Sequence, residues 1–125
     1  MPDARRLAIL LLMTASLAAA RPSAGFASYP GARRLCAEHV SGTPMHLTWR
    51  SYATRDSLDT VVAHYERATG RKATTLASGE RRLEWNANHK LGIYPAADND
   101  RFPHCETKPT RDERTVILIS TAVGR

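Results

Sequence analysis

Two cysteines and the histidines near them are the residues whose types and spacing could do chemistry in this chain. His39 follows Cys36 by three residues, and His104 stands directly before Cys105. Two thiolates and two imidazoles could hold a tetrahedral zinc ion, although adjacent His and Cys ligands are awkward to place around one metal. In an oxidising compartment, an even cysteine count in a small chain instead favours a disulfide. We expect Cys36 and Cys105 to be bonded, with no metal or cofactor.

The remaining polar motifs predict no catalytic residue. Asp98-Asn-Asp100 resembles the start of a calcium loop but lacks the glycine and the final glutamate, so we expect a solvated turn. His64 could act as a general base, but no nucleophile or carboxylate is placed by the sequence to work with it, so we expect a surface histidine. The alternative is a small hydrolase or metal-dependent enzyme with a site near Cys36 and Cys105.

Residues 1–20 have the pattern of a secretory signal peptide. A basic start is followed by an uncharged apolar run, Leu7–Leu17, and by Ala18-Ala19-Ala20 as a cleavage site. Gly25-Phe26-Ala27 offers a second cleavage site. The apolar run is shorter than the ~20 residues that span a bilayer. We therefore expect a secreted or periplasmic protein with no membrane span after cleavage at Ala20, or alternatively at Ala27.

Charge and length restrict the class of partner. The 125 residues are enough for one domain, and removing residues 1–20 takes away two arginines and one aspartate, so the formal charge falls from +6 to +5. Basic residues are spread along the chain and interleaved with acidic ones, which disfavours nucleic acid as a partner. An anionic envelope component or a protein partner fits this weak positive charge better.

One helix can be predicted from periodicity. Asp56 is a good N-cap, and Gly70 suits the left-handed position that ends a helix. Between them, four apolar residues fall on one helical face: Leu58, Val61, Val62 and Tyr65.

The rest of the chain from residue 45 onwards reads mainly as strands. Thr115–Thr121 is continuously apolar, as in a central strand, and Pro95 places its strand at an edge or marks its end. Residues 21–44 are expected to form an irregular arm and residues 96–114 a long loop, which together cover part of the outer sheet face and are fastened by the disulfide. The predicted strands are 45–53, 72–77, 80–87, 91–95 and 115–121. We predict an α+β domain over 45–125, with a single helix packed on a mainly antiparallel sheet of about five strands (β-α-β-β-β-β).

Two short motifs suggest a relationship. Tyr29-Pro-Gly-Ala32 precedes the first predicted strand, and Tyr52–Glu66 contains an Asp-Ser helix start with a Val-Val…Tyr face. These features resemble a group of small exported bacterial α+β domains of unknown function. The resemblance implies the fold and export, and it carries no catalytic residues.

The alternating strands also predict a ligand-binding face. If Met45, Leu47 and Trp49 face the helix, the intervening side chains face the other way. Five polar or aromatic residues would then share the outer face: His46, Arg50, Tyr52, Arg82 and Tyr94. Such a surface suits an anionic or aromatic ligand or a protein partner. We expect a non-catalytic binding or cell-envelope accessory protein.

Overall fold

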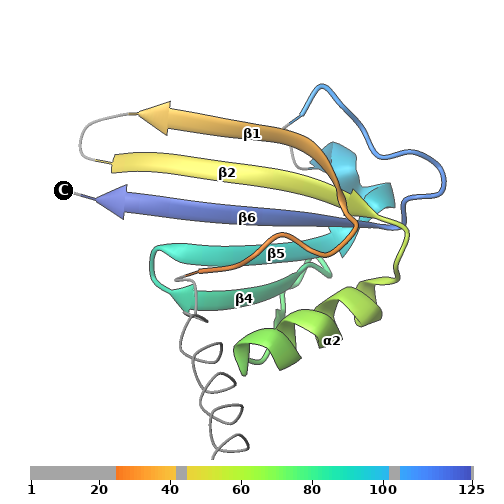
Figure 1. The fold of residues 1–125 in the computed structure, drawn as a ribbon, viewed down its shortest axis with the longest axis horizontal. Helices are drawn as coiled ribbons and strands as arrows, with labels where there is room; N and C mark the ends of the chain where they lie inside the picture. Colours follow the sequence, from red (N-terminus) through yellow and green to blue (C-terminus); the bar gives the residue numbers. More distant parts are fainter. Residues whose placement is uncertain (1–24, 42–44, 102–104, 125) are drawn as a thin grey trace, which may run out of the picture.

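The computed structural model describes residues 25–41, 45–101 and 105–124, which form an antiparallel sheet of six strands with a helix on one face (Figure 1). The order of the strands across the sheet is β1-β2-β6-β5-β4-β3. In chain order the elements are β1 (Arg33–Ser41), β2 (Met45–Thr54), α2 (Leu58–Thr69), β3 (Thr74–Thr75), β4 (Arg81–Asn86), β5 (His89–Pro95), the 3-10 helix η3 (Ala96–Arg101) and β6 (Thr115–Gly124).

The predicted α+β class is confirmed, but the sheet has one strand more than expected. Strand β6 lies in the centre between β2 and β5, as its continuous apolar sequence predicts. The expectation of an irregular arm was wrong over Arg33–Ser41, which pairs with β2 along its whole length. This edge strand escapes notice because most of its side chains are exposed and show no apolar alternation.

Helix α2 begins one residue later than predicted. Ser57, and not Asp56, is the N-cap, since its side-chain oxygen accepts a hydrogen bond from the backbone N–H of Thr60. Gly70 ends the helix in the left-handed conformation, with φ of 71°. The predicted apolar stripe is confirmed, because Val61, Val62 and Tyr65 are buried against the sheet and Leu58 packs beside them.

The two faces of the sheet carry separate apolar clusters. The larger cluster lies on the helix side and consists of Phe26, Tyr29, Tyr52, Val61, Val62, Tyr65, Leu83, Leu91, Ile93, Ile117 and Ile119. The smaller cluster lies on the far side and consists of Leu35, Ala53, Tyr94 and Val116, with Ala96, Cys105 and Leu118 packed against it. Both faces of the central strands are therefore buried.

Strand β2 presents the opposite face to the helix from the one predicted. Tyr52 lies opposite Ile117 of β6 and belongs to the helix-side cluster, so the residues that alternate with it, Leu47 and Trp49, face the far side. Leu47 is exposed there. Alternation separates the two faces of a strand, but the register with β6 decides which of them meets the helix.

The segment before β1 is part of the helix-side core. Phe26 packs edge-on against Tyr65 and Trp85, and the Tyr65 hydroxyl donates to the carbonyl of Ala27 at 2.7 Å. The Tyr29 hydroxyl donates to the carboxylate of Asp56 just before the helix. Figure 1 shows this segment crossing the helix side of the sheet before it enters β1. The described part of the arm before β1 therefore lies on the helix side and not on the outer face.

The long loop lies on the far side and is tied to the sheet edge. A disulfide joins Cys36 of β1 to Cys105, as predicted. Within the loop, Asp98 lies in η3, a 3-10 helix, where a solvated turn was predicted. The predicted signal peptide, residues 1–20, lies outside the described residues. None of the helices in the described ranges is long and apolar enough to cross a membrane.

Candidate functional site: an open cationic cavity

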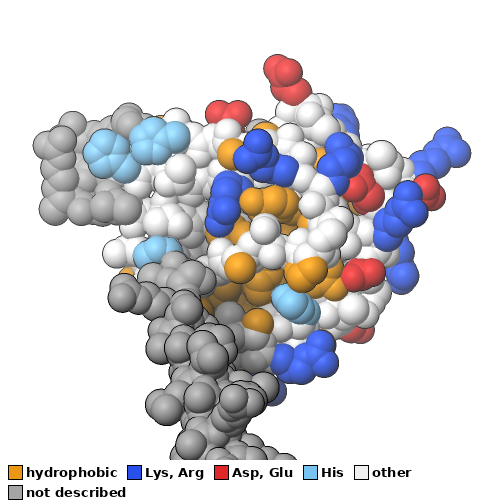
Figure 2. Space-filling model, in the orientation of Figure 1, with side chains coloured by type: hydrophobic (Ala, Val, Ile, Leu, Met, Phe, Trp, Pro, Cys, Tyr) orange, Lys and Arg blue, Asp and Glu red, His pale blue; other side chains and the backbone are white. Residues whose placement is uncertain are grey.

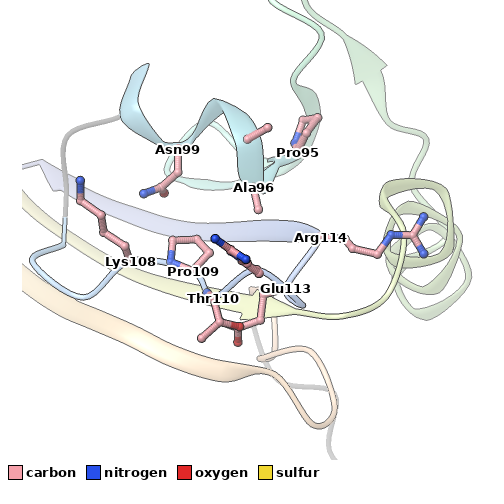
Figure 3. Close-up of a pocket in the computed structure, with 10 residues that line it drawn as sticks. Pro95, Ala96, Asn99, Lys108, Pro109, Thr110, Glu113 and Arg114 are labelled. Atoms are coloured by element: carbon pink, nitrogen blue, oxygen red, sulfur yellow. The ribbon is translucent and has the colours of Figure 1, made fainter.

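An open cavity of about 520 Å³ lies where the sheet meets the long loop (Figure 3). Residues of η3 form one wall, and the chain that returns to β6 forms the other. The described residues that line it are Pro95, Ala96, Ala97, Asn99, Lys108, Pro109, Thr110, Arg111, Glu113 and Arg114.

The wall formed by η3 is held by two hydrogen bonds from the sheet. The backbone N–H of Ala96 donates to the carbonyl of Arg114 at 2.9 Å, which extends the contact between β5 and the start of β6. One turn further, the Tyr94 hydroxyl donates to the side-chain oxygen of Asn99 at 3.3 Å. Burial in the far-side cluster raises the pKa of Tyr94 to about 12, so this hydroxyl stays protonated as the donor.

The opposite wall is held by Arg33 of the edge strand. Its Nε donates to Glu113 at 3.1 Å and its Nη2 to the other carboxylate oxygen at 2.6 Å. The same Nη2 donates to the carbonyl of Lys108 at 3.1 Å. Because Arg33 reaches both ends of the Lys108–Glu113 segment, the missed strand β1 positions this wall of the cavity.

Glu113 is the only carboxylate among the described lining residues, and its negative charge is balanced by Arg33. The hydrogen bonds from Arg33 lower the pKa of Glu113 to about 2, against the opposing effect of its burial. The backbone N–H of Thr110 adds a further donor at 2.8 Å. Glu113 is therefore ionised at neutral pH, and Arg33 neutralises it within the wall.

The remaining charges of the lining are positive. Lys108 and Arg111 are exposed side chains on the loop wall. Figure 3 shows Arg114 extending away from the cavity, which leaves Lys108 and Arg111 as the other cations of its lining. With Glu113 balanced by Arg33, the cavity carries an excess of positive charge.

This lining suits binding better than acid–base chemistry. The described lining residues include no histidine and no cysteine. A carboxyl group with a pKa near 2 is too weak a base to accept a proton efficiently at neutral pH. Cationic side chains, the Thr110 hydroxyl and the Asn99 amide can instead hydrogen-bond an anionic group.

A second open cavity, of about 590 Å³, adjoins the first and shares Thr110 and Glu113 with it. Arg33, Arg55 and Asp56 also line this second cavity. Glu113 thus lines both cavities, and Arg33, which pairs with it, lines the second.

The five residues predicted to share a binding face do not do so. His46, Arg50 and Tyr52 lie on the helix side, because Tyr52 is buried in the cluster beneath the helix and the other two alternate in step with it. Arg82 and Tyr94 lie on the far side, where Tyr94 is a core residue. The prediction was wrong because β2 turns the opposite face towards the helix from the one expected.

The arginines of that predicted face have partners within the domain. Arg50 donates to the carbonyl of Phe26 at 3.4 Å, and Arg82 pairs with the buried carboxylate of Glu80 at 3.1 Å. His64 packs edge-on against the rings of Tyr29 and Tyr65, with centroid distances of 5.0 and 5.2 Å. These side chains therefore make contacts that hold the domain together.

The alternative zinc site is contradicted for its cysteines and for one of its histidines. Both thiols are consumed in the disulfide. His39 lies on the helix side of β1, whereas Cys36 faces the far side opposite Ser51. His104 lies outside the described residues.

Sequence reasoning missed Arg33, Lys108, Arg111 and Glu113 as members of one site. The available signal was the length of the 96–114 loop, which is unusual in a compact domain unless it is functional. These residues form one site only because Arg33 contacts Glu113. Neither the spacing of residues nor their periodicity predicts that contact.

Comparisons of the chain with protein-family models, with curated proteins and with solved structures find no match.

Proposed function

We propose that this chain is an exported, non-catalytic binding or cell-envelope accessory domain. In this proposal, the cavity between η3 and residues 108–114 holds an anionic group of an envelope component or of a protein partner. The observation that carries it is the charge arrangement of the cavity. Its single described carboxylate, Glu113, is bonded by Arg33, while Lys108 and Arg111 are exposed members of the lining.

Electrostatics support an anion over a cation. An incoming anion meets Lys108 and Arg111 first, and the repulsion from Glu113 is offset by the guanidinium bonded to it. A carboxylate or phosphate can form charge-assisted hydrogen bonds with both cations, and Arg favours two-point contacts with such groups. Because the side chains are exposed, binding should weaken as salt is added.

The rigidity of the walls also supports binding. The Tyr94 hydroxyl donates to Asn99 of η3, and the Ala96 N–H of η3 donates to the Arg114 carbonyl. Arg33 holds the loop. The disulfide joins Cys36, three residues after Arg33, to the loop that precedes Lys108. Walls that are ordered before the ligand arrives reduce the entropy lost on binding.

The test is a titration of the purified protein, monitored by amide chemical shifts. Inorganic phosphate and citrate serve as soluble probes, and vesicles containing phosphatidylglycerol serve as an anionic surface. We expect one or more of these probes to shift resonances of residues 96–99 and 108–114. Replacing both cations, Lys108→Ala with Arg111→Ala, should weaken that binding by about tenfold or more.

The matched control removes the same charge elsewhere. Arg67→Ala with Lys72→Ala takes two exposed cations from the end of α2 and the residues that follow it. The control should retain most of the affinity. Equal weakening in both double variants would show that net charge alone attracts the probes, and an absence of shifts around the cavity with every probe would refute the proposed site.

A further inference from the structure

Two imidazole rings lie face to face on the exposed end of the sheet. His39 of β1 and His46 of β2 have ring centroids 5.8 Å apart and an angle of 18° between their planes. His39 is exposed and His46 is half-buried. Figure 2 shows two adjoining histidine side chains at this end of the molecule, far from the helix.

The pairing of β1 with β2 sets this arrangement. His39 lies opposite Thr48, and His46 lies opposite Ser41, so the histidines are diagonal neighbours on one face of an antiparallel pair. Diagonal positions place long side chains within reach of each other. Since both backbones belong to the same ladder, the two rings are held near each other without a ligand.

We propose that His39 and His46 form a two-imidazole site for a borderline transition-metal ion, of the class of Zn²⁺, Ni²⁺ or Cu²⁺. Imidazole nitrogen is a preferred ligand of these ions. Among the described residues, no third His, Cys, Asp or Glu joins the pair. In this proposal, water or a group from a partner completes the coordination. The site shares no residue with the cationic cavity.

The metal alternative drawn from the sequence combined His39 with the cysteines. The structure separates them, because β1 sends Cys36 to the far side and His39 to the helix side. His46, seven residues along the chain, takes the place of the thiolates as the neighbour of His39. This ligand pair is set by strand register, and the sequence alone does not indicate it.

The test is a calorimetric titration of the untagged protein with Zn²⁺ and, separately, with Ni²⁺ at about pH 7.5, where imidazole is mostly neutral. We expect one ion per chain. His39→Asn and His46→Asn should each weaken binding by about tenfold or more, since even a residue that only supports a metal ligand contributes about 10–100-fold. The double variant should lose about as much affinity as either single variant, because one imidazole alone already holds the ion weakly.

A third histidine on the same face is the matched control. His89 of β5 lies opposite Thr121 of β6, which in turn lies opposite Thr48, so two strands separate it from His39. His89→Asn should leave the affinity unchanged, and thermal unfolding checks that each variant is folded. Losses that add in the double variant would indicate two separate sites, and unchanged affinity in either folded single variant would overturn the proposal.

Discussion

The carboxylate of Glu80 lies over the backbone of Gly92, so that a Cβ at residue 92 would collide with Oε1. Glu80 precedes β4, and Gly92 is in the adjacent strand β5. The carboxylate is almost fully buried and pairs with Arg82. Gly92 does not adopt a positive φ, so its requirement for glycine comes from the space that Glu80 fills and not from backbone strain.

Replacing Gly92→Ala should therefore destabilise the domain by about 1–3 kcal/mol, as overpacking of a filled site usually does. The same substitution in a Glu80→Ala background should cost much less, because the colliding carboxylate is gone. Urea unfolding of the four proteins in this double-mutant cycle measures the coupling. Equal costs of Gly92→Ala in both backgrounds would show that Glu80 is not the obstacle.

The Arg33–Glu113 pair predicts a loss of stability in acid. The pKa of Glu113 is lowered from 4.5 to about 2 in the folded protein, so the native state favours the charged form. Its contribution is fully present above about pH 4.5 and is lost as the pH falls towards 2. Glu113→Gln should cost about 1–3 kcal/mol at neutral pH and make stability less dependent on pH in that window.

Urea midpoints at several pH values from neutral to acid measure this effect. The control is Glu84→Gln, which alters an exposed pair with Lys90 at 3.9 Å and should change stability little. If wild type and Glu113→Gln lose stability in parallel between pH 4.5 and 2, Glu113 is not the group responsible.

Opening the disulfide should destabilise the whole domain. Cys36 and Cys105 are 69 residues apart, and a loop of that length is worth about 4 kcal/mol in the chain-entropy model. Urea unfolding of Cys36→Ser with Cys105→Ser, compared with oxidised wild type, measures the difference. Thiol titration of the denatured wild type should find no free thiol before reduction and two after it. Two free thiols before reduction would contradict the bond.

Phe26 makes the segment before β1 part of the core. Phe26→Ala should cost about 3–5 kcal/mol, because a buried aromatic ring between Tyr65 and Trp85 is lost. Ser28→Ala, an exposed change in the same segment, should have little effect. Thermal or urea unfolding compares the two variants.

The same packing bears on the two predicted cleavage sites. Cleavage after Ala27 would remove Phe26 and leave Trp85 and Tyr65 without that contact. If the chain is exported as proposed, we expect the mature form to retain Phe26, in keeping with cleavage after Ala20. N-terminal sequencing or intact mass of the secreted product decides this, and a stable product that begins at Ser28 would refute it.

Short-range patterns predicted the elements whose residues interact along the chain. The stripe from Leu58 to Tyr65 marks α2 because residues three and four apart share a helical face. The uninterrupted apolar run of β6 marks a strand buried on both sides. Strand β1 was missed because an edge strand in contact with solvent needs no apolar pattern.

The chain by itself determined the helix, the central strand, the disulfide partners and the α+β class, since each follows from local periodicity or from cysteine count. Only the tertiary structure decided which face of β2 meets the helix, because an alternating strand fits either way until Tyr52 is paired with Ile117. The tertiary structure also determined which residues come together in each of the two proposed sites. Arg33 reaches Glu113 and His39 reaches His46 through strand register, and register is a property of paired strands that no single segment of sequence contains.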